Sequence, residues 1–131
     1  MSKFPTLTLN EDGIFLEYHF DEFISKSCAM FVAEERNRLS KNICRPLLVE
    51  FKELKGFSPE TRCMDLNFIL NSVSALAYYM DINTKEGRQS KQVADSFFSI
   101  TPWPIPVKIF YDKNEALNWL KEYLPDNQPT T

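Results

Sequence analysis

The chain opens with two short segments in which apolar and polar residues alternate. They cover residues 7–9 and 14–20, and the four residues between them end in an Asp-Gly pair, which favours a tight turn. This pattern predicts a hairpin of two antiparallel strands. In the second strand Ile14, Leu16 and Tyr18 share one face, and we expect that face to be the core side.

A helical period replaces the alternation in the next segment. From about Ser25 to Ser40, apolar residues recur at the spacing of one face of an amphipathic helix. That apolar face comprises Cys28, Phe31, Val32 and Leu39, and the expected polar face comprises Glu34, Glu35, Arg36 and Arg38. Residues 46–51 follow and are apolar at both alternating positions, which is typical of a central strand covered by helices on both sides.

Strand and helix patterns then alternate again. Ser58 is a natural N-cap and Pro59 suits the first helical position, so we predict a helix from there to about Leu70. Residues 74–80 predict a second buried strand, and a polar loop separates it from a further helix. The apolar stripe of that helix comprises Val93, Ala94, Phe97 and Phe98.

The remaining segment predicts one more strand and one more helix. Three alternating prolines between residues 101 and 106 force an extended chain, which leads into a short edge strand over residues 107–111. Asp112, followed three residues later by Glu115, is a variant of the capping box and marks the start of the last helix. The apolar stripe of this helix comprises Ala116, Leu117, Leu120, Tyr123 and Leu124.

The predicted elements follow the order β-β-α-β-α-β-α-β-α. Strands separated by helices favour parallel neighbours, and the opening hairpin adds an antiparallel pair. The expected fold class is therefore α/β, with a mixed five-stranded sheet and four helices. A chain of 131 residues suits a single domain, which we place at residues 1–125, and residues 126–131 form a polar tail that we expect to be frayed.

Composition and charge narrow the classes of protein that fit this fold. The net charge of −3 disfavours nucleic acid as a partner, since proteins that bind it neutralise phosphates with excess Lys and Arg. The N-terminus lacks the apolar segment of a signal peptide, and no apolar run reaches the ~18 residues of a membrane span. The three cysteines show no paired spacing, as expected of reduced thiols. We therefore expect a cytoplasmic protein with no membrane partner.

Two segments carry a family resemblance: residues 45–54 read RPLLVEFKEL, and residues 107–120 read VKIFYDKNEALNWL. The first is similar to the central strand of the SpoIIAA-like branch of the STAS family, which includes the anti-sigma-factor antagonists. The second is similar to the C-terminal strand and helix of the same proteins. With the order of elements, the resemblance covers about residues 7–124 and implies a STAS-like fold that acts in regulation through protein contacts.

The chain departs from this family at the phosphorylation site of its regulated members. Those members carry Asp-Ser and then a small residue at the start of the helix after the central strand. In this chain Ser58 falls about where that Asp lies, and Pro59 about where the phosphorylated Ser lies. The phosphorylation switch is therefore not carried over, and a helix cap is the favoured role of Ser58.

Few residues are suited to catalysis. His19, the only histidine, lies in a strand with no Cys or carboxylate at ligand spacing, so we expect a surface histidine rather than a zinc ligand or a triad member. Cys28 and Cys63 are expected at the edge of the core. The three glycines are isolated, which excludes the glycine-rich phosphate loops. We predict no catalytic residue, no metal site, no cofactor and no enzymatic activity.

One loop is the best candidate for a binding site. It leaves the carboxyl end of a buried strand at Asp81 and enters a helix, and open α/β sheets place ligand crevices at such ends. Free N–H groups at the helix start, together with Lys85, Arg88 and Lys91, would suit an anion. An ordinary capped loop is the alternative. The candidate residues for a partner or ligand are Ser58, Asp81, Asn83, Thr84, Lys85 and Arg88, with Asn83 or Thr84 as the cap.

Two functions fit these observations. The first is a non-catalytic regulatory or protein–protein interaction module with an unidentified protein partner, and a homodimer paired at the edge strand of the hairpin stays open. The second is a domain that binds a small apolar or anionic ligand, with the many Phe and Leu side chains lining a cavity. Trp103, between two prolines, is either an exposed anchor for a partner or the closure of the core.

Overall fold

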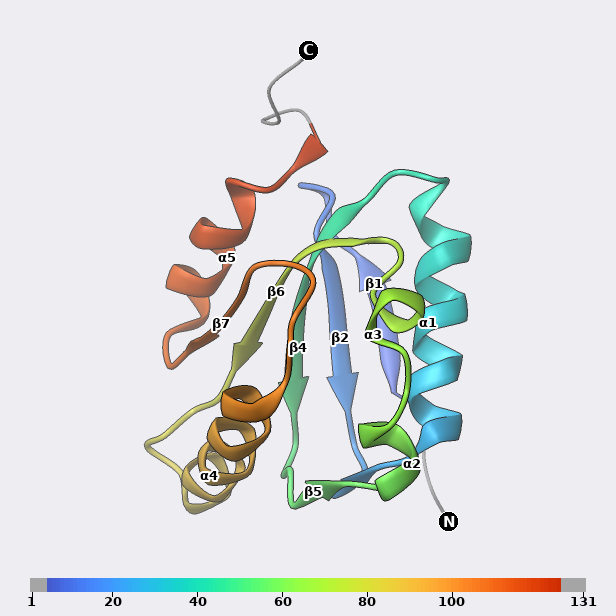
Figure 1. The fold of residues 1–131 in the computed structure, drawn as a ribbon. Coiled ribbons are helices and arrows are strands. Elements are labelled where there is room, and N and C mark those ends of the chain that lie inside the picture. Colours follow the sequence, from blue (N-terminus) through green and yellow to red (C-terminus); the bar gives the residue numbers. More distant parts are fainter. Residues whose placement is uncertain (1–4, 126–131) are drawn as a thin grey trace.

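Five strands form one mixed sheet, and the computed structural model describes residues 5–125 (Figure 1). The bounds are Thr6–Leu9 (β1), Phe15–His19 (β2), Arg45–Phe51 (β4), Val73–Tyr79 (β6) and Val107–Phe110 (β7). In the order β1-β2-β4-β6-β7, the first pair is antiparallel and the others are parallel. This confirms the predicted mixed sheet and the edge position of β7, while the predicted tail lies outside the described residues.

Helices cover both faces of this sheet. Their bounds are Lys26–Ser40 (α1), Pro59–Arg62 (α2), Leu66–Ile69 (α3), Lys85–Ile100 (α4) and Lys113–Lys121 (α5). α5 packs on β4, β6 and β7 from one side. α1, α3 and α4 supply apolar side chains to the core on the other side.

Polar side chains start these helices where the sequence predicts. The N-caps are Ser25 for α1, Ser58 for α2, Thr84 for α4 and Asp112 for α5. In each case the side-chain oxygen accepts a backbone N–H of the first turn, which that turn cannot satisfy by itself. The cap of α4 is thus Thr84 and not Asn83.

The single helix predicted over residues 58–70 is instead two short helices. α2 ends at Arg62, and the Asp65 side chain starts α3 by accepting the N–H of Asn67. Asp favours such a local bond over a place inside a continuous helix, which explains the break. A separate two-stranded parallel sheet joins β3 (Phe23–Ile24) to β5 (Gly56–Phe57). It was not predicted, because two residues carry no alternation.

Two apolar clusters, one on each face of the sheet, form the core. The cluster beneath α5 comprises Ile14, Leu48, Ala75, Ala77, Phe110, Ala116 and Leu120. The cluster beneath α1, α3 and α4 comprises Phe15, Leu47, Val49, Leu70, Val73, Leu76, Tyr78, Met80 and Ala94. Successive strand residues alternate between the two clusters, because side chains of a strand point to opposite faces in turn.

The face assigned to the core in β2 is wrong along most of the strand. Leu16 and Tyr18 are only half buried, whereas Phe15, Glu17 and His19 are buried on the face that α1 covers. The cause is the uneven cover of the sheet. α5 packs mainly on β4, β6 and β7, so no helix buries the corresponding face of β2 to the same depth.

Other polar residues also lie where the sequence did not place them. His19 was expected at the surface and Arg36 on the polar face of its helix, but their exposures are 4 % and 2 %. Both are buried because Glu17 supplies a buried partner for each. Cys63, expected at the core edge, is exposed at the break after α2. Trp103 is half buried and packs against the core, so it closes the core and is not a fully exposed anchor.

Candidate functional site

The predicted binding loop lies at the end of the sheet toward which β2, β4 and β6 point, and α2 and β5 lie at that end too (Figure 1). Its polar groups shape the start of α4. The Asp81 carboxylate accepts the N–H of Asn83 at 3.0 Å. The Thr84 hydroxyl donates to the Asp81 carbonyl and accepts the N–H of Gly87, both at 2.9 Å. These hydrogen bonds satisfy backbone N–H and carbonyl groups of the loop itself, as in an ordinary capped turn.

Of the positive side chains of this loop, Lys85 and Arg88 are exposed and Lys91 is half buried, and two of the three have a local partner. Arg88 donates to the Ile82 carbonyl at 3.1 Å, and Lys91 pairs with Asp95 at 2.6 Å. Lys85 makes no ion pair within residues 5–125. Only one of these side chains is therefore fully available to a partner without losing a local bond.

A hollow of about 220 Å³ lies beside the loop, at the ends of the central strands. Asp81 and Thr84 line it, and Glu50 and Lys52 contribute from the end of β4. Lys85 and Arg88 are not part of its wall. The two carboxylates reduce the positive potential that an anion would need there.

Ser58 lies outside that hollow and serves as the cap of α2. Its hydroxyl accepts the N–H of Thr61 and shares a 2.7 Å hydrogen bond with the Thr61 hydroxyl. That hydroxyl in turn donates to the Ile24 carbonyl at 2.9 Å. The structure thus brings Asp81 and Thr84 together, but it does not place Ser58 in the same hollow.

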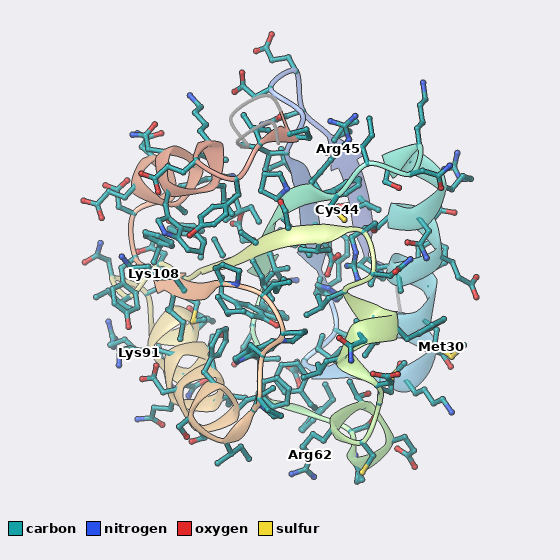
Figure 2. The ribbon with its side chains drawn as sticks, turned by 45° about the horizontal axis from the view of Figure 1, so that its top comes forward. Met30, Cys44, Arg45, Arg62, Lys91 and Lys108 are labelled. Atoms are coloured by element: carbon teal, nitrogen blue, oxygen red, sulfur yellow. The ribbon has the colours of Figure 1, made fainter. Side chains whose placement is uncertain are left out.

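Next to Ser58, a groove of about 510 Å³ runs between β5 and α4. This α4–β5 groove is lined by Gly56, Phe57, Arg62, Gln92, Val93, Ser96, Phe97 and Ile100. Ile100 is 77 % exposed. Phe23 of β3 is 59 % exposed, and its ring lies against Gly56 of the paired strand β5. Figure 2 shows Arg62 on α2 at the outside of the molecule. The sequence offered no signal for this groove, since it depends on the pairing of β3 with β5.

A second site, which sequence reasoning missed, is a buried polar cluster between β2 and α1. Glu17 is at its centre. One carboxylate oxygen lies 2.5 Å from His19 Nε2, and the other accepts Arg36 Nη1 at 2.5 Å. Arg36 Nη2 also donates to the Ile69 carbonyl at 2.6 Å, and Cys28 Sγ lies 3.6 Å from His19 Nδ1.

The charges in this cluster do not cancel. Burial by itself would raise the pKa of Glu17, but Arg36 and His19 hold that pKa below its ordinary value. Burial would lower the pKa of His19, but the Glu17 carboxylate outweighs it and raises the pKa to about 9. At neutral pH two positive side chains therefore face one carboxylate.

The cluster forms part of the wall of a cavity. This cavity has a volume of about 80 Å³ and lies between the sheet and helices α1, α3 and α4. Glu17, His19, Arg36 and Tyr78 supply polar groups to its wall, which is otherwise mostly apolar. Concave, mostly apolar sites with a few convergent polar groups are the usual form of small-molecule sites.

The order Cys28, His19, Glu17 matches the nucleophile, base and orienting acid of a cysteine hydrolase, but the geometry does not favour that chemistry. Cys28 is 4 % exposed and is not part of the cavity wall. A histidine that holds its proton up to about pH 9 is a poor base at neutral pH.

Within residues 5–125, no three His, Cys, Asp or Glu side chains are arranged to hold a metal ion. In the same residues, no helix combines the length and apolar character needed to cross a membrane.

Comparison with known proteins identifies the fold and the family. No curated protein matches the chain. A solved structure, an uncharacterized protein of the DUF3478 family with a SpoIIAA-like fold from Shewanella loihica PV-4, aligns with a TM-score of 0.56 and 17% identity over 88% of this chain and 91% of that one. The SpoIIAA-like fold implied by the resemblance is therefore confirmed. A family model matches residues 7–124, so the chain belongs to the domain of unknown function DUF7793.

Proposed function

We propose that this domain is a non-catalytic interaction module that binds a partner protein through the α4–β5 groove. The observation that supports this most directly is exposed apolar surface at the groove: Ile100 lines it, and Phe23 lies against Gly56, which lines it too. Apolar side chains gathered at one place on the surface mark interaction sites more often than the same side chains scattered singly. Ser58, from the predicted site, lies beside the same groove at the start of α2.

The groove also indicates the chemistry of the partner. Phe57 and Phe97 form an apolar floor, and exposed Arg62 stands beside it without an ion pair in the described part of the chain. An apolar side chain next to an Asp or Glu would therefore be complementary to the groove. The loop between β6 and α4 lies at the same end of the molecule as α2 (Figure 1). Exposed Lys85 and Arg88 in the first turn of α4 add positive charge, and we include them in the proposed surface.

Affinity capture from the cells that contain this protein tests the proposal. The bait is the full chain, compared with a Phe23→Ser/Ile100→Ser variant and with a control variant, Leu9→Ser/Ile43→Ser, that removes two other exposed apolar side chains. We expect a protein that the wild type and the control capture and the groove variant loses. Capture that is equal for all three baits would contradict the proposal. If light scattering shows a dimer that only the groove variant abolishes, the partner is a second copy of the chain.

A further inference from the structure

The cavity beside Glu17, His19 and Arg36 has the construction of a site for a small molecule. Its volume of about 80 Å³ exceeds the 10–15 Å³ or so that a single water needs on this measure. The wall combines apolar side chains of the sheet with others from α1, α3 and α4, among them Val32, Leu47, Val49, Leu76 and Phe97. A ligand that fills it must therefore be small and largely apolar.

Two side chains in the cavity wall hold a buried N–H group with no hydrogen-bond partner within residues 5–125. These groups are Arg36 Nε and Trp103 Nε1. A buried donor without a partner costs about 1–3 kcal/mol. Both groups are donors, so the missing partner is a hydrogen-bond acceptor. Tyr78, which is 7 % exposed, also lines the cavity, and its hydroxyl can donate to the same acceptor.

The charge of the same wall favours an acceptor that is negative. Both oxygens of Glu17 are already bound, one by His19 and the other by Arg36. The raised pKa of His19 and the lowered pKa of Glu17 leave one positive charge in excess at neutral pH. Buried charge is costly unless it is paired, so a second carboxylate would stabilise this arrangement.

Two residues border both the cavity and the α4–β5 groove. Phe57 and Phe97, stacked with centroids 4.3 Å apart, line both the cavity and the α4–β5 groove. Two aromatic rings are therefore the wall between the cavity and the groove.

From these observations we propose that the cavity binds a small carboxylic acid as its anion, with the carboxylate directed to Tyr78 and Arg36 and the apolar body packed against the sheet. Entry is between Phe57 and Phe97. This site goes beyond the interaction module, since it does not depend on a partner in the groove.

Titration calorimetry on the full chain tests the proposal, with acetate, butyrate, hexanoate and benzoate as probes and the corresponding amides as neutral controls. We expect at least one acid to bind with a Kd below about 1 mM and its amide to bind at least 10-fold more weakly. The key variant is Tyr78→Phe. It keeps the ring that stacks on Phe51 and removes only the hydroxyl, so the fold should be retained.

Tyr78→Phe should weaken binding of that acid about 10-fold, the size of one lost hydrogen bond. Tyr18→Phe, on the opposite face of the sheet, should leave binding unchanged. The proposal is overturned if no acid binds to the folded protein, if the amide binds as tightly as the acid, or if Tyr78→Phe and Trp103→Phe both leave binding unchanged. Because no partner protein is present, these results do not depend on the groove proposal.

Discussion

On one face of the sheet, the strands and α5 pack through seven buried apolar residues, whereas the opposite face also buries Glu17, His19 and Arg36 and borders a cavity. The same central strands supply both faces. Beneath α5, the small side chains of Ala75, Ala77 and Ala116 let the helix approach the sheet closely. Beneath α1, Glu17 and Arg36 occupy positions where apolar residues would satisfy the fold equally well.

This difference separates the requirements of folding from those of binding. Burying an ion pair rarely stabilises a protein more than well-packed apolar residues would, because desolvation offsets the attraction. The α5 face shows that this chain packs a helix on the sheet with apolar contacts alone. We infer that the polar groups on the other face are present for a ligand, and the following experiments test how far the two faces differ.

The largest effect is expected at Glu17. Glu17→Gln removes the only carboxylate among residues 5–125 that pairs with His19 and Arg36, and loss of one member of a buried ion pair costs about 3–5 kcal/mol of unfolding free energy. Urea unfolding at pH 7 measures this loss. The double variant Glu17→Leu/Arg36→Met should recover most of it, because no buried charge is then left unpaired at Arg36. A double variant less stable than Glu17→Gln would show that the fold itself needs the pair.

The matching change on the α5 face is Leu120→Ala. Leu120 is fully buried, and such a truncation costs about 2–5 kcal/mol through lost contacts and the cavity it leaves. We expect a value near 3 kcal/mol in urea unfolding and no change in the binding of the carboxylic acid. Leu117→Ala, on the same helix but half buried, should cost less. A Leu120→Ala variant that folds but no longer binds the acid would mean that the two faces are coupled.

The pH dependence of stability should come from the polar face. The pKa of His19 in the folded protein is about 9, against 6.5 for an unperturbed histidine, so its stabilisation is complete below pH 6.5 and is lost as the pH rises through 9. Between pH 7 and 10 we expect a loss of about 2 kcal/mol from this group.

Urea unfolding of the wild type and of His19→Gln isolates this contribution from that of the other groups near His19, which are Glu17, Cys28, Arg36 and Tyr78. The difference in stability between the two proteins should shrink as the pH rises. A constant difference would show that His19 is not protonated in the folded state at pH 7.

The smallest effects are expected at the helix caps, where the two faces should be alike. Thr84→Ala removes the cap of α4 and Asp112→Ala removes that of α5, and each should cost about 1 kcal/mol of unfolding free energy. Thermal unfolding of both variants gives the comparison. If the two substitutions cost clearly different unfolding free energies, part of the difference in stability between the two faces would arise at the helix ends.

Several features of this protein were accessible from the sequence because their signals are local. The Asp-Gly turn, the central strand at residues 46–51 and the caps at Ser58 and Asp112 each depend on neighbouring residues only. The break at Asp65 was missed, since the patterns on both sides of it continue one helix. Of the predicted site, Asp81 and Thr84 do share a hollow, because both follow the same strand closely.

The buried cluster and the α4–β5 groove were decided by tertiary structure alone. Glu17 and Arg36 are 19 residues apart, and by local pattern each reads as a solvent-facing residue of its own strand or helix. They become buried because α1 covers one face of β2 while α5 lies over the strands beyond it. Whether a charge is buried depends on what covers it and on which partner it meets, and neither is encoded in the spacing of nearby residues.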